Sequence, residues 1–486
     1  MKKAFFILAL YLAQVVILSA AEGPASSDFS SRVQAILSRQ NVPVGDLGIE
    51  IVSLETGKRL SSTSSERLFS VASNNKIVTT AAALHFLGPS YTFRTEVLLD
   101  GKPDREGSLS GRLVVKGTGD PNISGRFFDG DPLAPMRLVA GKLKKSGLKR
   151  LVGPIVADDT FFDRVYLHPN WKESNLAYWY SAETSALSFN DNRIDITLVP
   201  QEDGEPPQVI LSPPTSYVTI ENSCRTTSNP KGPGPSFSRK PGSNIISIRG
   251  SCFKKAGSTT HSVTVHEPAL YFATALREEL VREGIEIVGE VRTIESGESL
   301  PHGPPAVILT SNLAETIYVS NKRSQNFYAE QILKLLGRLR RGEGSFQAGA
   351  KVVEEFLNYV GIPRGTYSYV DGSGLSPNNR FSPSQIASVL EFMHSHRYGQ
   401  TFLDSLAIGG VDGTLRRRWK KSPLKGNVVA KTGSIEGAHA LSGYLRNKNG
   451  ERFAFSILYN RSTGKSLPIR QLEEEILTLL YETNSP

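Results

Sequence analysis

The sequence predicts an α/β fold of the α+β type, in which an antiparallel sheet flanked by helices is built from both ends of the chain. Segments with the apolar or alternating pattern of strands lie near the start and near the end, and helix-like segments accompany both groups. Between them runs a long succession of further strand-like segments. We therefore expect the sheet-and-helix domain at about 22–90 and 305–486, and inserted β-rich domains at about 91–304, with a nested one at about 195–265.

The first part of the chain has strands and a helix in succession. Gly48–Val52 has the apolar pattern of a strand, and a turn at 55–58 leads to a second short strand near Arg67–Ser70. Lys76–Leu87 is rich in Ala, Thr and apolar residues, and a Gly-Pro pair follows it. Because Gly and Pro end helices, this segment predicts a helix that stops at Leu87.

The middle of the chain changes to strand-like patterns. These segments are Leu113–Val115, Arg193–Val199, Val209–Leu211, Tyr217–Ile220, Asn244–Ile248 and Ser262–Val265. The stretch Ser228–Ser243 is rich in Gly, Pro, Ser and Lys and predicts an exposed loop. The middle therefore predicts a β-rich insert.

Helical periodicity returns after Pro305. Helices are expected at Asn326–Leu339, Ala348–Tyr359 and Pro383–His394. Strands are then expected at Lys425–Ala430, Ala440–Leu445 and Arg452–Tyr459, and a closing helix at Ile469–Tyr481. These strands and those near the start would form one sheet.

The first residues have the layout of a secretory leader. Lys2 and Lys3 precede an uncharged apolar run from Ala4 to Leu18, and small residues follow up to Ala21. The run is shorter than the ~20 residues that a membrane span needs, although a retained anchor is the alternative. We therefore expect residues 1–21 to be a signal peptide and the protein to be exported to the periplasmic or cell-wall space.

Composition limits the classes of partner and cofactor. The formal net charge of +9 is mildly basic, which suits a solvated surface or attraction to an anionic wall polymer, and export makes nucleic acid a poor partner. No His-Glu-x-x-His or Cys-x-x-Cys pattern occurs, so no metal site and no cofactor are expected. Cys224 and Cys252 would form a disulfide outside the cytoplasm or remain two buried thiols.

Three short patterns occur in order along the chain. They are Ser73-Asn74-Asn75-Lys76, Ser324-Gln325-Asn326 and Lys431-Thr432-Gly433. Each is weak alone, but among the Ser-x-x-Lys patterns only that at Ser73 opens an Ala-rich helix, which would place Lys76 one turn later on the same face. A lysine with a lowered pKa can take the proton of a serine hydroxyl, so this pair predicts an activated nucleophile. A helix cap beside a solvated lysine is the alternative.

With these motifs the chain resembles a family, the penicillin-binding proteins that act as D-alanyl-D-alanine carboxypeptidases and endopeptidases. The similarity is to the low-molecular-mass class C group with a large insert. It also rests on the segments Lys116–Pro121, Ala186–Asn190, Asp371–Ser376, Gly410–Leu415 and Ala440–Tyr444. The resemblance implies a transpeptidase/β-lactamase-like domain with inserted domains between Lys76 and Ser324.

The resemblance also implies an acyl-enzyme mechanism. Ser73 would attack the carbonyl between two D-alanines of a peptidoglycan stem peptide, with Lys76 as general base. Ser324 would relay a proton to the leaving amine. β-Lactam antibiotics mimic the D-alanyl-D-alanine end and should acylate Ser73.

Substrate-binding roles are implied for the other motif residues. Asn326 would orient the substrate amide, and Lys431, Thr432 and Gly433 would hold the terminal carboxylate, a pairing of charge and hydroxyl that suits an anion. Backbone N–H groups of Ser434 and of the nucleophile would form the oxyanion hole, because a tetrahedral intermediate needs two donors aimed at one oxygen.

In this group an acidic residue of the insert can meet the free amino group of the stem peptide. Asp158 is our candidate, Asp159 is its rival, and a surface turn is the alternative. Glu354–Asn358 fits the E-x-x-L-N pattern of class A β-lactamases, but exposed acids on an amphipathic helix explain it better. His439 would pack beside the Lys-Thr-Gly strand or line the cleft.

The predicted function is a serine-type D-alanyl-D-alanine carboxypeptidase with endopeptidase activity on cross-links. One alternative is a non-catalytic penicillin-binding sensor or wall-binding protein that keeps the fold. Another is a β-lactamase, which would release the hydrolysed drug quickly. Peripheral association with wall or membrane is a further expectation.

Overall fold

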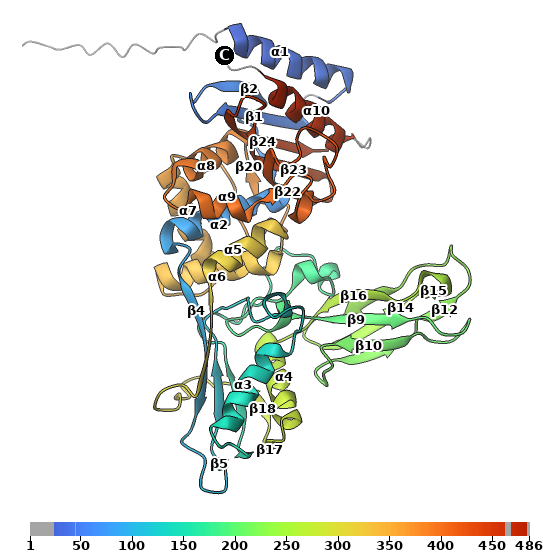
Figure 1. The fold of residues 1–486 in the computed structure, drawn as a ribbon, viewed down its shortest axis with the longest axis vertical. Coiled ribbons are helices and arrows are strands. Elements are labelled where there is room, and N and C mark those ends of the chain that lie inside the picture. The colour runs from blue at the N-terminus through green and yellow to red at the C-terminus, as the bar shows by residue number, and fades with distance from the viewer. Residues whose placement is uncertain (1–23, 44, 462–467, 484–486) are drawn as a thin grey trace, which may run out of the picture.

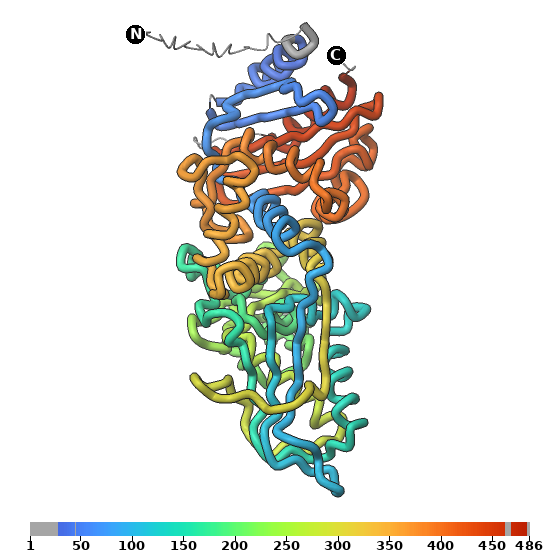
Figure 2. Tube along the Cα trace, turned by 90° about the vertical axis from the view of Figure 1, so that its left-hand side faces the viewer, coloured from blue at the N-terminus to red at the C-terminus, as the bar shows by residue number. Residues whose placement is uncertain are grey.

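Figure 1 shows the computed structural model, which describes residues 24–43, 45–461 and 468–483. The predicted signal peptide at 1–21 lies outside the described residues. The molecule is elongated: the sheet-and-helix domain lies at one end and the insert extends from it, as Figures 1 and 2 both show. Within the described ranges, no helix is long and apolar enough to cross a membrane.

The sheet of the first domain combines strands from both ends of the chain. Its strands are β1 (Leu47–Ser53), β2 (Arg59–Thr63), β21 (Ala407–Ile408), β22 (Val428–Ile435), β23 (Ala438–Arg446) and β24 (Arg452–Asn460). They lie in the order β2-β1-β24-β23-β22-β21, and every neighbouring pair is antiparallel. The predicted fold class, an antiparallel sheet built from both chain ends with helices beside it, is confirmed.

Helices cover both faces of this sheet. On one face, α1 (Pro24–Arg39) and α10 (Ile469–Glu482) bury apolar side chains against β1, β23 and β24. The opposite face packs against a second apolar cluster that helices of the middle and late chain share. These helices are α2 (Asn75–Leu87), α5 (Leu313–Lys322), α6 (Asn326–Arg341), α7 (Phe346–Val360), α8 (Pro383–Ser395) and α9 (Gly399–Ser405), with the short pair β3 (Phe69–Ser70) and β20 (Arg380–Phe381) beside them. Helix α2 is almost wholly buried among them.

The insert leaves and returns through neighbouring strands. Strand β4 (Thr92–Leu99) leads out, and β19 (Val307–Asn312) leads back and pairs with it antiparallel from Thr92↔Asn312 to Val97↔Val307. Both belong to a five-stranded sheet with β6 (Leu113–Lys116), β8 (Ile155–Asp158) and β18 (Val291–Thr293). A smaller sheet holds β5 (Ser108–Ser110), β7 (Arg150–Val152) and β17 (Glu286–Val288).

Two helices in the insert were not expected. They are α3 (Ala134–Lys145) and α4 (Pro268–Arg282), which bury apolar side chains such as Met136, Val139 and Phe272 against the sheets. Both begin with a proline in the first turn, which favours a helix start. The sequence analysis missed these two helices because most of the surrounding segments have strand-like patterns.

A nested β domain projects sideways from the insert (Figure 1). Its strands are β9 (Arg193–Val199), β10 (Gln208–Ser212), β11 (Thr219–Asn222), β12 (Arg225–Thr227), β13 (Ser236–Arg239), β14 (Ile245–Arg249), β15 (Ser251–Phe253) and β16 (Thr259–Thr264). Strand β13 lies within the stretch that was expected to be a loop. Its residues form a strand because they pair with β14, a contact that the local sequence does not reveal. Cys224 and Cys252 are buried free thiols whose sulfurs lie 3.5 Å apart beside the paired strands β12 and β15.

Candidate active site

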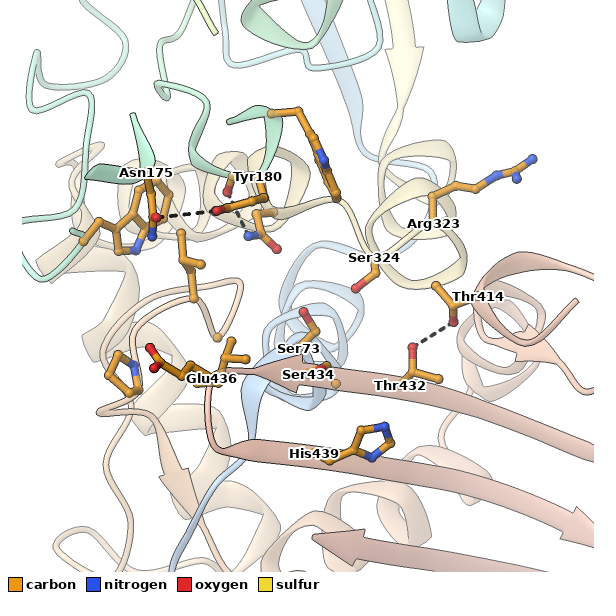
Figure 3. Close-up of a pocket in the computed structure, with 18 of the residues that line it drawn as sticks. Ser73, Asn175, Tyr180, Arg323, Ser324, Thr414, Thr432, Ser434, Glu436 and His439 are labelled. Atoms are coloured by element: carbon orange, nitrogen blue, oxygen red, sulfur yellow. Dashed lines mark hydrogen bonds between the residues drawn. The ribbon is translucent and has the colours of Figure 1, made fainter. Parts of the chain in front are cut away.

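The three motifs meet where the sheet, α2 and α6 come together. Ser73 lies in η1 (Ala72–Asn74), a short 3-10 turn that leads directly into α2. Ser324 lies in the link between α5 and α6, and Lys431 lies inside β22. Figure 3 shows Ser73, Ser324 and Ser434 around one space. The strand prediction stopped at Ala430, whereas β22 continues to Ile435 and so carries the whole Lys-Thr-Gly motif.

Lys76 is fully buried and its ammonium nitrogen has three oxygen partners. Its Nζ lies 2.9 Å from Ser73 Oγ, 2.7 Å from Asn326 Oδ1 and 2.7 Å from the carbonyl oxygen of Ser373. Burial disfavours the charged form and lowers the pKa of Lys76 to about 7. Near neutral pH this amine can therefore accept the proton of the Ser73 hydroxyl, and the predicted pair of nucleophile and base has the geometry that its chemistry needs.

The second serine of the site contacts the second buried lysine. Lys431 Nζ donates to Ser324 Oγ over 2.8 Å and to the carbonyl of Thr432 over 2.7 Å. Burial lowers the pKa of Lys431 well below its usual value, and the charge of Lys76 lowers it further. Ser324 has a φ of 59°, a left-handed conformation that costs free energy for a non-glycine residue and is often found at functional sites. The Ser324 hydroxyl is thus held beside a proton source.

Strand β22 runs very close to the turn that carries the nucleophile. A Cβ added at Gly433 would lie 3.0 Å from the backbone nitrogen of Ser73 and 2.9 Å from the carbonyl oxygen of Val71, so only glycine fits there without displacing η1. Ala72, just before the nucleophile, has a φ of 45°. Figure 3 shows Ser434, the residue after Gly433, beside Ser73, where the backbone N–H groups of the two residues would form the predicted oxyanion hole.

A cavity of about 1050 Å³ opens over these groups, and the insert forms one of its walls. Trp171, Trp179 and Tyr180 of the insert line it. The carbonyl of Tyr180 accepts from Asn326 Nδ2 over 2.8 Å, which fixes the amide so that its oxygen faces Lys76. Trp171 Nε1 donates to Asp371 over 2.9 Å. No sequence signal indicated this wall, because its residues belong to the insert and reach the cleft only through the fold.

Glu330 is a buried acid that supports the catalytic lysine and was not predicted. It lies on α6 one turn after Asn326, and its two carboxylate oxygens accept from the backbone N–H groups of Gly372 and Ser373, each over 2.8 Å. The carbonyl of Ser373 is one of the three partners of Lys76. Burial and the nearby Asp371 raise the pKa of Glu330 to about 8. Glu330 therefore holds the loop that holds the base.

Replacing Glu330 with Gln is expected to slow acylation of Ser73 by benzylpenicillin by about 10- to 100-fold, because a small misplacement of a reacting group has an effect of this size. An amide has an NH₂ group in place of one of the two oxygens of Glu330, so one backbone N–H of the loop faces a donor and loses its acceptor. Stopped-flow kinetics would separate the acylation rate constant, which should fall, from the non-covalent affinity, which should change little. Glu354→Gln is the matched control, because Glu354 lies on α7 and forms an ion pair with the exposed Arg364. Equal rates for both variants would contradict the role of Glu330.

Asp158 does not line the cavity. It ends strand β8, where its buried carboxylate accepts from the backbone N–H of Thr160 over 3.0 Å and from the Thr160 hydroxyl over 2.6 Å. Its rival Asp159 binds Arg164 and Tyr166. Both carboxylates are buried, so they do not belong to a surface turn, the alternative considered from the sequence: Asp158 is used within the turn after β8, and Asp159 bonds to side chains further along the chain.

Two other sequence features are placed by the structure. Glu354 and Glu355 are on the surface of α7, paired with Arg364 and Arg341, as expected for acids on an amphipathic helix. His439, which was expected either to pack beside the Lys-Thr-Gly strand or to line the cleft, lines the cavity. Among residues 24–43, 45–461 and 468–483 no cluster of three or more His, Cys, Asp or Glu side chains could hold a metal ion.

This fold and site define a class of protein, the serine hydrolases in which a buried lysine activates the nucleophile. The model of the D-Ala-D-Ala carboxypeptidase 3 (S13) family matches residues 29–477, and the chain belongs to this family. It is 31% identical over 462 residues to the D-alanyl-D-alanine carboxypeptidase of Actinomadura sp. (strain R39), covering 92% of this chain and 84% of that relative. The family and enzyme class predicted from the sequence, a serine-type D-alanyl-D-alanine carboxypeptidase, are confirmed.

Solved structures show the same fold. Penicillin binding protein 4 from Haemophilus influenzae is similar with a TM-score of 0.80 and 24% identity, covering 92% of this chain and 99% of that one. A structure of that protein complexed with a novel β-lactam gives a TM-score of 0.74 and 24% identity, covering 93% of this chain and 98% of that one.

Proposed function

We propose that this protein removes the terminal D-alanine from peptidoglycan stem peptides through an acyl-enzyme on Ser73. The observation that carries the proposal is the position of Lys76, fully buried with its Nζ 2.9 Å from Ser73 Oγ. Lys76 takes the hydroxyl proton as Ser73 Oγ bonds to the carbonyl carbon. The C–N bond then breaks, and Ser324 passes a proton to the departing amine. Water cleaves the ester, giving its hydroxyl to the acyl carbon and its proton back through Lys76.

The terminal carboxylate of the substrate has a matching set of groups. Lys431 is buried beneath the cleft, where its Nζ donates to Ser324 Oγ, and the Thr432 hydroxyl lines the cleft and donates to Thr414 Oγ1 over 2.9 Å. A charged donor together with hydroxyl donors suits a carboxylate. The same groups suit the carboxylate of a β-lactam, and we propose that such drugs acylate Ser73.

Export and wall association belong to the same proposal. The leader-like sequence at 1–21 and the proposed peptidoglycan substrate both support a periplasmic or cell-wall location. Peripheral contact with wall or membrane would bring the cleft to its polymer substrate. Fractionation of cells that express the full chain, followed by mass determination of the mature N-terminus, tests this location.

The function is tested with a stem pentapeptide and benzylpenicillin. We expect the wild-type protein to release D-alanine from the pentapeptide and to gain one lasting drug adduct by intact mass. An adduct without D-alanine release would favour the sensor alternative, and rapid release of hydrolysed drug would favour a β-lactamase. No adduct and intact drug would overturn the assignment of Ser73.

The acylation rate is expected to rise with pH through about 7 and then level off. The base must be unprotonated to accept the Ser73 proton, and burial lowers the pKa of Lys76 to about 7. Below that pH the unprotonated fraction, and with it the rate, should fall about tenfold per pH unit. Stopped-flow acylation by benzylpenicillin across this range checks the profile. A flat profile, or a rate that falls above pH 7, would contradict Lys76 as the base.

A further inference from the structure

The cavity continues beyond the catalytic residues into a positively charged end. Its wall there is made by Arg417, Arg418, Arg470 and His439, which we call the cationic end. In Figure 3, β22 runs between Ser73 and His439, and His439 lies on β23 as the cross-strand partner of Ser434. None of the residues of the cationic end has a task in the mechanism described above.

Two arginines of the cationic end, Arg417 and Arg418, follow Thr414 closely in the chain, and Thr414 bonds to Thr432 on the leaving-group side of the nucleophile. Strand β22 passes the nucleophile at Gly433, and its continuation to Ser434 and Glu436 lies toward one end of the cleft. On the other side of the nucleophile, Thr432 bonds to Thr414. Three consecutive arginines, 416–418, follow Thr414 closely in the chain, and the last two of them belong to the cationic end. Since Thr432 is proposed to hold the carboxylate of the departing residue, an extension of that residue would lead past Thr414 toward these arginines.

One buried acid, Glu473, pairs with one arginine of the cationic end and, among the described residues, leaves the charges of the other two arginines unpaired. Glu473 on α10 is fully buried and pairs with Arg418 over 2.7 Å. Its other oxygen lies 3.1 Å from His439 Nδ1, without hydrogen-bond geometry. Arg417 and Arg470 are exposed to the cavity, and in the described part of the chain no carboxylate lies within ion-pair distance of either. Two arginine charges thus remain available to a ligand.

A leaving D-alanine cannot use these charges. Its single carboxylate is already matched by Lys431 and Thr432, and it carries no further anionic group. A leaving group that is itself an acidic peptide has such groups, and guanidinium groups bind carboxylates in a bidentate geometry.

We propose that the cationic end is a subsite for an acidic peptide leaving group, the second stem peptide of a peptidoglycan cross-link. This inference rests on the proposed function and extends it to cross-link hydrolysis. The amide between the D-alanyl carbonyl and the amine of the second peptide breaks, and Ser324 protonates that amine. The cationic end holds the carboxylates of the departing peptide. Water then supplies the hydroxyl that ends the D-alanyl ester.

The test compares three substrates with one double variant. The substrates are the stem pentapeptide, a cross-linked peptide dimer with free carboxylates, and the same dimer in which the carboxylates of the second peptide are amidated, except the one on the departing residue that Lys431 and Thr432 would hold. The variant is Arg417→Ala with Arg470→Ala, and the matched control is Arg416→Ala, an exposed neighbour that does not line the cavity. We expect kcat/KM of the double variant on the acidic dimer to fall about tenfold or more, since two charge-assisted contacts are lost. Pentapeptide hydrolysis should change less than about twofold, within the small effect of a distant surface change.

Three further results decide the proposal. Amidation of the dimer should lower kcat/KM of the wild type and abolish its difference from the double variant. Equal losses on pentapeptide and dimer, or a loss in Arg416→Ala as large as in the double variant, would overturn the subsite. A wild type that releases D-alanine and is acylated by benzylpenicillin, but leaves the dimer intact, would also overturn the subsite while the proposed function stands. Failure of both acylation and D-alanine release would instead overturn the proposed function.

Discussion

Replacing Ser73 with Ala is expected to abolish covalent trapping by benzylpenicillin and to lower kcat/KM for D-alanine release by at least about 10⁴-fold, the scale seen when a serine nucleophile is removed. The Ser73 hydroxyl lies 2.9 Å from Lys76 Nζ, and without this hydroxyl no acyl-enzyme forms. Intact mass after incubation with the drug, together with a D-alanine assay, measures both effects.

The fold should survive this change, because it removes one oxygen and leaves the other two partners of Lys76 in place. Thermal unfolding of Ser73→Ala should therefore lie close to that of the wild type. Ser228→Ala is the control: it alters another Ser-x-x-Lys pattern, on the exposed surface of the nested domain, and should retain full activity. A drug adduct on the Ser73 variant would show that another residue is the nucleophile.

The second large effect is expected for Lys76→Met, which keeps the length and volume of the side chain but removes the base. Loss of a general base lowers a rate by about 10²- to 10⁴-fold, so acylation should fall by this factor while the serine is still present. The carbonyl of Ser373 and the amide of Asn326 lose a charged partner, which adds a modest loss of stability.

A control variant at another buried lysine distinguishes the two expected effects of Lys76→Met, the loss of the base and the loss of stability. Lys334 on α6 is also fully buried, donates to Asp163 and the carbonyl of Val165, and does not line the cavity. Lys334→Met should lower the unfolding temperature but change the acylation rate far less than Lys76→Met. Similar acylation rates in the two variants would show that Lys76 acts through stability and is not the base.

The sequence predicted the parts of the site that local patterns encode. The spacing of Ser73 and Lys76 at the start of an Ala-rich segment places both on one helical face, and the structure has them 2.9 Å apart. The terminal strands Gly48–Val52 and Arg452–Tyr459 are apolar enough to be identified separately, and β1 and β24 pair as neighbours. These features depend on residues close together in the chain.

The features that sequence reasoning missed depend on contacts between distant segments. Glu330 is unremarkable on a helix until the loop at Gly372 is folded against it. The Tyr180 carbonyl that orients Asn326 carries no side-chain signal at all, because the contact uses the backbone. The acid Asp158 was chosen for its position in the insert, but its carboxylate is used locally by the turn that ends its own strand.

The paired strands that connect the insert also bear on how the chain folds. Residues Thr92 and Asn312 are neighbours across β4 and β19, so the two ends of a very long excursion lie side by side. The entropy of closing a loop grows only slowly with its length, and it is recovered once the insert has folded and its ends have met. Once β4 and β19 are paired, the segment that carries Ser73 and the segment that carries Ser324 begin next to each other, as if a short connection joined them. An insert that folds first would therefore speed the docking of α2 against α6, the step that assembles the nucleophile, the base and Asn326.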